Sequence, residues 1–116
     1  MDIKVSENGK VNILQLKGRL DLSNAGELKE TVTTLLGQDK NLMHFNMREV
    51  DFINSSGLGA LVSMMKDIRL NKGRLTLSDL APYVHEIFDI TQLSNVFEIY
   101  SNEEEAIGSF PRTVMV

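Results

Sequence analysis

The hydrophobic pattern of the chain switches repeatedly between the period of a strand and that of a helix, and this alternation restricts the possible folds. Apolar and polar residues alternate from Val11 to Leu20, whereas leucines and a valine over 28–36 form one helical stripe. Strands separated by helices connect through right-handed crossovers, which predicts an α/β fold with a largely parallel sheet. The expected strands cover 11–20, 42–47, 74–78 and 96–100, and the expected helices begin near 23, 55, 82 and 102.

The N-terminus adds an antiparallel hairpin to this sheet. Asn8-Gly9 favours a tight turn, because both residues tolerate a positive φ, and a short strand from Ile3 to Val5 precedes it. The prediction is therefore a mixed, mostly parallel sheet packed with about four helices. A chain of 116 residues has the length of one domain, which we expect over 1–110, with a C-terminal tail at 111–116.

Helix starts are marked by side chains that can accept a hydrogen bond from a free backbone amide. Asn24 and Glu27 have the spacing of a capping box, and Ser23 also has the chemistry of an N-cap. Asn102 and Glu105 repeat this spacing before the last helix. We therefore expect the N-cap of the first helix at Ser23 or Asn24.

Composition excludes several classes of function. The chain has no cysteine, so a disulfide, a thiolate nucleophile and a cysteine zinc site are excluded. Twelve basic residues against sixteen acidic ones give a net charge of -4, which argues against nucleic acid as a partner. The N-terminus lacks the apolar run of a signal peptide, and no segment approaches the roughly 18 apolar residues of a membrane span. We expect a cytoplasmic protein that does not insert into a membrane.

The segment from Asp51 to Val62 is the most distinctive in the chain. Its small polar residues, Asn54, Ser55 and Ser56, stand where a strand ends and a helix begins. Loops at the carboxyl ends of strands are where α/β proteins meet ligands and partners. One of the three residues would suffice to cap the helix. A phosphate on a serine at this position would be stabilised by the helix dipole and free amides, so capping and phosphorylation both remain open.

Enzyme motifs do not fit this turn or the two histidines. A nucleophile elbow needs glycine two residues before its serine, and a phosphate-binding loop needs a lysine directly after its glycines; neither is present. Ser55, Asp79 and His85 have the residue types of a hydrolytic triad, but His85 falls on the polar side of its helix. His44 lies in an apolar strand without a second ligand at metal spacing. We expect no catalytic residue, no metal and no cofactor.

Three motifs in order along the chain resemble those of one protein family. They are Gly18-Arg19-Leu20-Asp21, the turn at 54–59, and Phe88-Asp89-Ile90-Thr91-Gln92-Leu93. Over about residues 3–110 the chain is similar to STAS domains of the anti-sigma factor antagonist type. The resemblance implies a STAS fold and a partner-switching cycle. In such a cycle the unmodified antagonist binds an anti-sigma factor serine kinase, which releases the sigma factor for transcription.

By the same resemblance the protein is a substrate and a binding module, and not an enzyme. The kinase would transfer phosphate from ATP to Ser55, with Ser56 as the second choice, and a PP2C-type phosphatase would remove it. The resemblance also implies a monomer when the protein is free. Partner contacts are implied at Asp21, Ser23, Asn54, Ser55, Ser56, Gly57, Leu58 and Gly59.

The chain departs from the family pattern at three positions. It has Asn54 where Asp is usual, Arg19 where Glu is usual, and Gln92 in place of a glycine. Either the partner carries compensating changes, or this member binds without being phosphorylated. The alternative function is therefore a constitutive STAS adaptor in a scaffold or a lipid-transport complex. A small enzyme or nucleotide binder that uses the amides of the turn is a third alternative.

Overall fold

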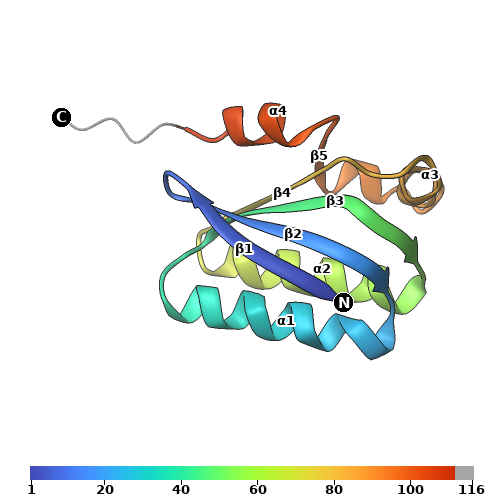
Figure 1. The fold of residues 1–116 in the computed structure, drawn as a ribbon, viewed down its shortest axis with the longest axis horizontal. Helices are drawn as coiled ribbons and strands as arrows, with labels where there is room; N and C mark the ends of the chain where they lie inside the picture. The colour runs from blue at the N-terminus through green and yellow to red at the C-terminus, as the bar shows by residue number, and fades with distance from the viewer. Residues whose placement is uncertain (112–116) are drawn as a thin grey trace.

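The computed structural model describes residues 1–111, within which five strands form one sheet in sequence order (Figure 1). The first pair is antiparallel and the other pairs are parallel. The strands are β1 (Asp2–Asn8), β2 (Val11–Leu20), β3 (Leu42–Ile53), β4 (Arg74–Ser78) and β5 (Glu98–Tyr100). The helices are α1 (Leu22–Gly37), α2 (Ser55–Leu70), α3 (Pro82–Ile90) and α4 (Glu103–Gly108), with a 3-10 turn, η1 (Leu93–Asn95). The predicted α/β fold with an antiparallel N-terminal hairpin is confirmed.

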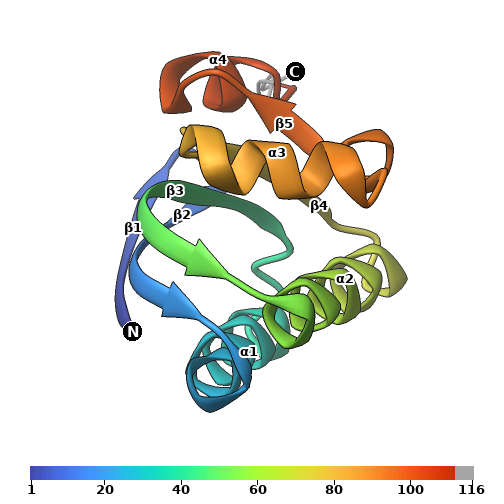
Figure 2. The same ribbon diagram turned by 90° about the vertical axis from the view of Figure 1, so that its right-hand side faces the viewer.

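One face of the sheet is apolar and carries the main core. α1 and α2 lie side by side beneath it, and α3 contributes to the same core (Figure 1, Figure 2). The helical stripe predicted over 28–36 faces the strands, as expected for a helix that buries one side. Fully buried side chains meet there from strands and helices, among them Leu14, Phe45, Leu77, Leu28, Leu61 and Phe88.

α4 packs on part of the opposite face of the sheet, which buries polar side chains beside a small apolar cluster of Val11, Ile13 and Phe110 (Figure 1). His44 is fully buried, with Nδ1 2.7 Å from Thr76 Oγ1 and Nε2 2.8 Å from Ser78 Oγ. The Ser78 hydroxyl donates to Asp79, so its oxygen accepts from Nε2–H, while Nδ1 accepts from the Thr76 hydroxyl. His44 is thus a packed strand residue, as predicted. Asn46, on the same face, donates to Glu103 of α4 at 3.0 Å.

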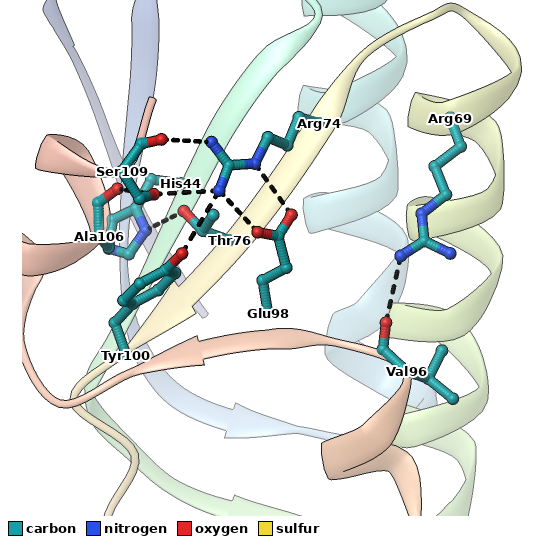
Figure 3. A network of polar contacts seen from close by, with 9 residues as sticks. All are labelled: His44, Arg69, Arg74, Thr76, Val96, Glu98, Tyr100, Ala106 and Ser109. Atoms are coloured by element: carbon teal, nitrogen blue, oxygen red, sulfur yellow. Dashed lines mark hydrogen bonds and ion pairs between the residues drawn. The ribbon is translucent and has the colours of Figure 1, made fainter. Parts of the chain in front are cut away.

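Arg74 joins the start of β4 to β5 and to the end of α4 (Figure 3). Its guanidinium donates to both Glu98 carboxylate oxygens, at 2.9 and 2.6 Å. It also donates to the Ser109 carbonyl at 2.9 Å and the Tyr100 hydroxyl at 3.3 Å, and lies over the Phe110 ring. A planar fork that meets a carboxylate with two bonds fixes orientation as well as distance. This cluster holds α4 against the sheet.

Several boundaries differ from the sequence prediction. β1 covers Asp2–Asn8 rather than 3–5, and Asn8 pairs with Val11, so the turn residues are Gly9 and Lys10 and only Gly9 takes a positive φ. The N-cap of α1 is Asp21, not Ser23 or Asn24, because Asp21 has an extended backbone and accepts from the amides of both later residues. β3 continues to Ile53, six residues beyond its predicted end, and β5 begins only at Glu98, after η1. The N-cap of α4 is Asn102, as predicted. Of the expected tail, residues 112–116 lie outside the described residues.

Candidate functional site

Two helices begin side by side at the end of β2 and β3. Leu20 pairs with Ile53 across these parallel strands, so the residues that follow them, Asp21 and Asn54, are neighbours. Each is the N-cap of its helix, with φ of -137° at Asp21 and -123° at Asn54. The start of α1 and the start of α2 therefore present one continuous edge, which we call the cap edge: residues 19–24 and 54–59.

Asn54 alone performs the capping of α2. Its side-chain oxygen accepts from the Gly57 amide at 3.0 Å, and its carbonyl accepts from the Leu58 amide at 2.9 Å. Ser55 and Ser56 occupy the first two positions of the helix and are exposed. Because Asn54 fills the capping role, both serine hydroxyls are left available to other groups.

The rest of the turn divides into buried and exposed positions. Gly57 is buried, and a Cβ built on it would collide with the Leu20 carbonyl oxygen. Glycine therefore allows α2 to start in direct contact with the end of β2. Leu58 is 8% exposed and belongs to the core, whereas Gly59 is on the surface. Gly57 and Leu58 thus shape the cap edge from beneath, and Asn54, Ser55, Ser56 and Gly59 form its surface.

Asp21 is held in place by the first turn of α1. It accepts from the Ser23 hydroxyl at 2.6 Å and from the Ser23 and Asn24 amides at 3.0 and 3.2 Å. The Ser23 hydroxyl bond, aided by both amides, lowers the pKa of Asp21 below its ordinary value. Asp21 therefore carries a fixed negative charge beside the exposed hydroxyl of Ser23.

Arg19 brings a positive charge to the same edge. Its Nε lies 3.5 Å from Asp21 Oδ2, and its guanidinium carbon lies 4.0 Å above the Phe52 ring. Arg19 pairs with Phe52 across β2 and β3, which explains why the cation stacks on this ring. Arg19, which stands where Glu is usual in the family pattern, thus makes ordered contacts at the cap edge.

Leu22 is a feature of the cap edge that the sequence analysis did not identify. It is the first residue of α1, directly after Asp21, and it is 80% exposed. It is a single exposed leucine, and isolated apolar side chains are common on protein surfaces. Leu22 falls outside the buried stripe of α1, which is formed by Ala25, Leu28, Val32 and Leu35.

The hydrolytic triad considered from the sequence is not assembled. His85 pairs with Asp89 on α3 at 3.2 Å, and Asp79 contacts Ser78 and Arg48, so neither of them meets Ser55. Among residues 1–111, no group of three or more side chains of the ligating types is placed to hold a metal ion. In the same part of the chain, no helix has both the length and the apolar character to cross a membrane.

Known proteins resemble the chain across nearly all its length. The sequence matches the STAS domain family over residues 2–106. The anti-sigma-B factor antagonist of Bacillus subtilis is 31% identical over 108 residues, which cover 92% of this chain and 95% of the relative. Its counterpart in Listeria monocytogenes is 28% identical over 109 residues, covering 94% and 95%.

A solved structure of similar fold is that of the Bacillus cell fate determinant SpoIIAA in its phosphorylated form. It superposes with a TM-score of 0.70 at 22% identity and covers 92% of this chain and 97% of that one. Fold, family match and identity to the Bacillus subtilis relative agree, and they show that this chain belongs to the STAS domain family.

Proposed function

We propose that this chain is an anti-sigma factor antagonist that works as a phosphorylation-switched binding module. Unmodified, it binds an anti-sigma factor and so releases the sigma factor which that partner holds. The Bacillus and Listeria relatives support this proposal, because both are named anti-sigma-B factor antagonists. The protein is then a binding partner and a substrate, and not a catalyst.

The finer proposal is that the partner is a serine kinase and that Ser55 is its target. The observation that carries it is the division of roles at the turn: Asn54 caps α2, so Ser55 is exposed with its hydroxyl free. Ser56 is exposed as well and is the second choice. We assign removal of the phosphate to a PP2C-type phosphatase.

The physical basis of the switch is a change of charge where the fold tolerates it. A phosphate adds about -1.5 to -2 charges, and the amides and dipole at the start of α2 stabilise negative charge. A partner that fits the neutral serine would face this added charge without a counter-ion of its own. Binding is therefore lost while the antagonist stays folded.

The partner surface is proposed to span the cap edge. Asp21, Ser23 and the exposed residues of the turn would make direct contacts, while Gly57 and Leu58 would set its shape. Arg19 reverses a charge relative to the family pattern, so the partner should carry an acidic group opposite it. We further propose that residues 1–110 act as one domain, monomeric when free, in the cytoplasm.

The test is phosphate incorporation and binding with the anti-sigma factor serine kinases of the same cell. Intact mass and phosphopeptide mapping after incubation with ATP should show one phosphate on Ser55. Ser55→Ala should abolish incorporation and keep binding, and the matched control Ser56→Ala should keep both. Ser55→Asp should weaken binding about tenfold or more, because it supplies part of the phosphate charge.

A constitutive adaptor is the second proposed function, and Asn54 is the observation that favours it. The family usually has a carboxylate at this position, whereas Asn54 caps α2 with a neutral amide. A stable complex with one of these kinases, or with a scaffold or lipid-transport protein, without any incorporated phosphate would establish the adaptor.

Phosphate on Ser56 alone would contradict the assignment of Ser55 as the phosphorylation site.

A further inference from the structure

The outer edge of β1 is open, and a groove runs between this strand and α1. In both ribbon views β1 is the outermost strand and α1 lies beneath it (Figure 1, Figure 2). The groove has a volume of about 710 Å³. Its floor includes Ile3 and Val5 of β1 and Leu35 of α1. An edge strand offers backbone N–H and C=O groups that an extended segment can pair with.

β1 lacks most of the features that protect an edge strand from pairing. It pairs with β2 in one uninterrupted register over seven residues, with neither a bulge nor a proline. Seven residues offer roughly 23 Å of strand to a partner. Val5 pairs with Leu14 and so points to the α1 side, where it is 47% exposed. The one lysine of β1, Lys4, pairs with Gln15 and points to the other side.

The rim of the groove is acidic. Glu27 and Glu30 of α1 line it, and among residues 1–111 no lysine or arginine does. Asp2 also borders the groove, but it pairs with Lys17 and, like Lys4, its side chain points to the far side of β1. The Met1 amino group lies 3.9 Å from Glu27 Oε1 and offsets that charge, so Glu30 is the carboxylate on the α1 side of the groove that no described cation pairs with. Long basic side chains fit this arrangement, because their aliphatic stems can cover Ile3 and Val5 while their charged ends reach the carboxylates.

We propose that the open edge of β1 and this groove bind an extended basic segment of a partner protein, which adds to the sheet as a further strand. Main-chain hydrogen bonds to β1 would supply affinity, and the acidic rim would select lysine or arginine. A second copy of this chain is a poorer occupant, since edge-to-edge pairing would bring two acidic rims together. The groove shares no residue with the turn at 54–59, so the inference stands independently of the phosphorylation switch.

The probe for this site is the fluorescein-labelled peptide Lys-Val-Lys-Val-Lys-Val-Lys, blocked at both ends. Fluorescence anisotropy should report binding to the full chain, and the largest amide shifts in NMR spectra should fall on β1 and α1. The same peptide with proline at its centre cannot form a continuous strand ladder and should bind about tenfold more weakly.

Two matched variants separate the groove from the overall charge of the protein. Glu30→Lys should weaken binding of the peptide about tenfold, and Glu30→Gln should weaken it less. Glu86→Lys makes the same change on the exposed surface of α3, away from the groove, and should change binding by no more than about twofold. Far-ultraviolet circular dichroism should show that all three variants are folded.

Several outcomes would overturn the proposal. Equal losses of peptide affinity in Glu30→Lys and Glu86→Lys would show that the effect comes from the net charge of the protein and not from the groove. Undiminished binding of the proline peptide would exclude strand addition, and amide shifts confined to other faces would exclude the groove. Sedimentation showing a dimer whose stability the Glu30→Lys change alters would assign the edge to a second copy of the chain.

Discussion

The two faces of the sheet are buried by different chemistry. The face covered by α1, α2 and α3 holds large apolar side chains, whereas the face that carries α4 buries His44, Asn46, Thr76 and Ser78 beside a small apolar cluster of Val11, Ile13 and Phe110. Within residues 1–111, no buried side-chain nitrogen or oxygen lacks a hydrogen-bond partner. The apolar face is therefore stabilised by the area it removes from water. The polar face depends on specific bonds, each of which fails when one atom is removed or protonated.

The largest effect is expected from a truncation on the apolar face. Phe45 is fully buried on β3, the central strand of the sheet, so Phe45→Ala should lower the free energy of unfolding by about 4 kcal/mol through lost burial and a residual cavity. Urea denaturation measures this. Ile90→Ala removes an apolar side chain that is 71% exposed and should cost less than about 1 kcal/mol. Similar losses in both variants would refute the assignment of the core.

Acid should weaken the polar face. Burial lowers the pKa of His44 to about 4, against 6.5 for an ordinary histidine, and Glu103 and Asp79 only partly offset this. The unfolded chain therefore binds the proton first, so stability falls as the pH drops from 6.5 towards 4. The total loss is about 3 kcal/mol. Above pH 6.5 this group contributes no pH dependence.

Urea denaturation between pH 7 and 4.5 measures this dependence. The matched variant is His44→Gln, which keeps a polar side chain but cannot be protonated in this range. Its free energy of unfolding should lack the slope of about 1.4 kcal/mol per pH unit expected for one proton. Equal slopes in the two proteins would show that His44 is not the responsible group.

A smaller loss is expected where the polar face meets α4. Arg74→Met removes the bonds to Glu98, Tyr100 and Ser109 and should cost about 2 kcal/mol, because it leaves a half-buried carboxylate without its partner. Arg48→Met is the control, since that arginine is 73% exposed and reaches only Asp79, at 3.4 Å. Thermal unfolding should separate the two variants by several degrees. Matching melting temperatures would contradict the proposed role of Arg74.

The smallest effect is expected at the start of α4. Asn102 accepts from the Glu105 amide at 2.8 Å, so Asn102→Ala should lower stability by about 1 kcal/mol. Hydrogen exchange of the α4 amides should rise before that of α1, because α4 has only six residues. Asn102→Asp should keep the cap and serves as the control. Unchanged exchange in Asn102→Ala would show that Arg74 alone holds the helix.

The alternation of periods was sufficient to predict the fold, and the failures have local causes. β3 was expected to end near Met47, but the register between β2 and β3 shifts beyond Gln15, and the next buried residues are Val50 and Ile53. Buried residues three positions apart do not show the alternation that indicates a strand. At α1, three residues could each serve as the cap, and only the extended backbone of Asp21 decides among them.

The cap edge was predicted in position but not in internal arrangement. The sequence identified the serine turn, because small polar residues between a strand and a helix form a local pattern. It could not assign the cap to Asn54, because three adjacent residues have the chemistry of a cap. It could not place Gly57 under the surface, because that depends on how β2 lies against α2. The hydrogen-bond partners of His44 could not be predicted from the sequence either, because strand pairing brings Thr76 and Ser78 to it.

Gly57 has a consequence for recognition. Since a side chain there would collide with Leu20, the spacing between the two caps is set by backbone against backbone, and no rotamer change can widen it. A partner that contacts Asp21 and Ser55 together would therefore meet two groups at a fixed distance. A chemical change at the serine would alter the group on one side, while the distance between the two helix starts stays the same.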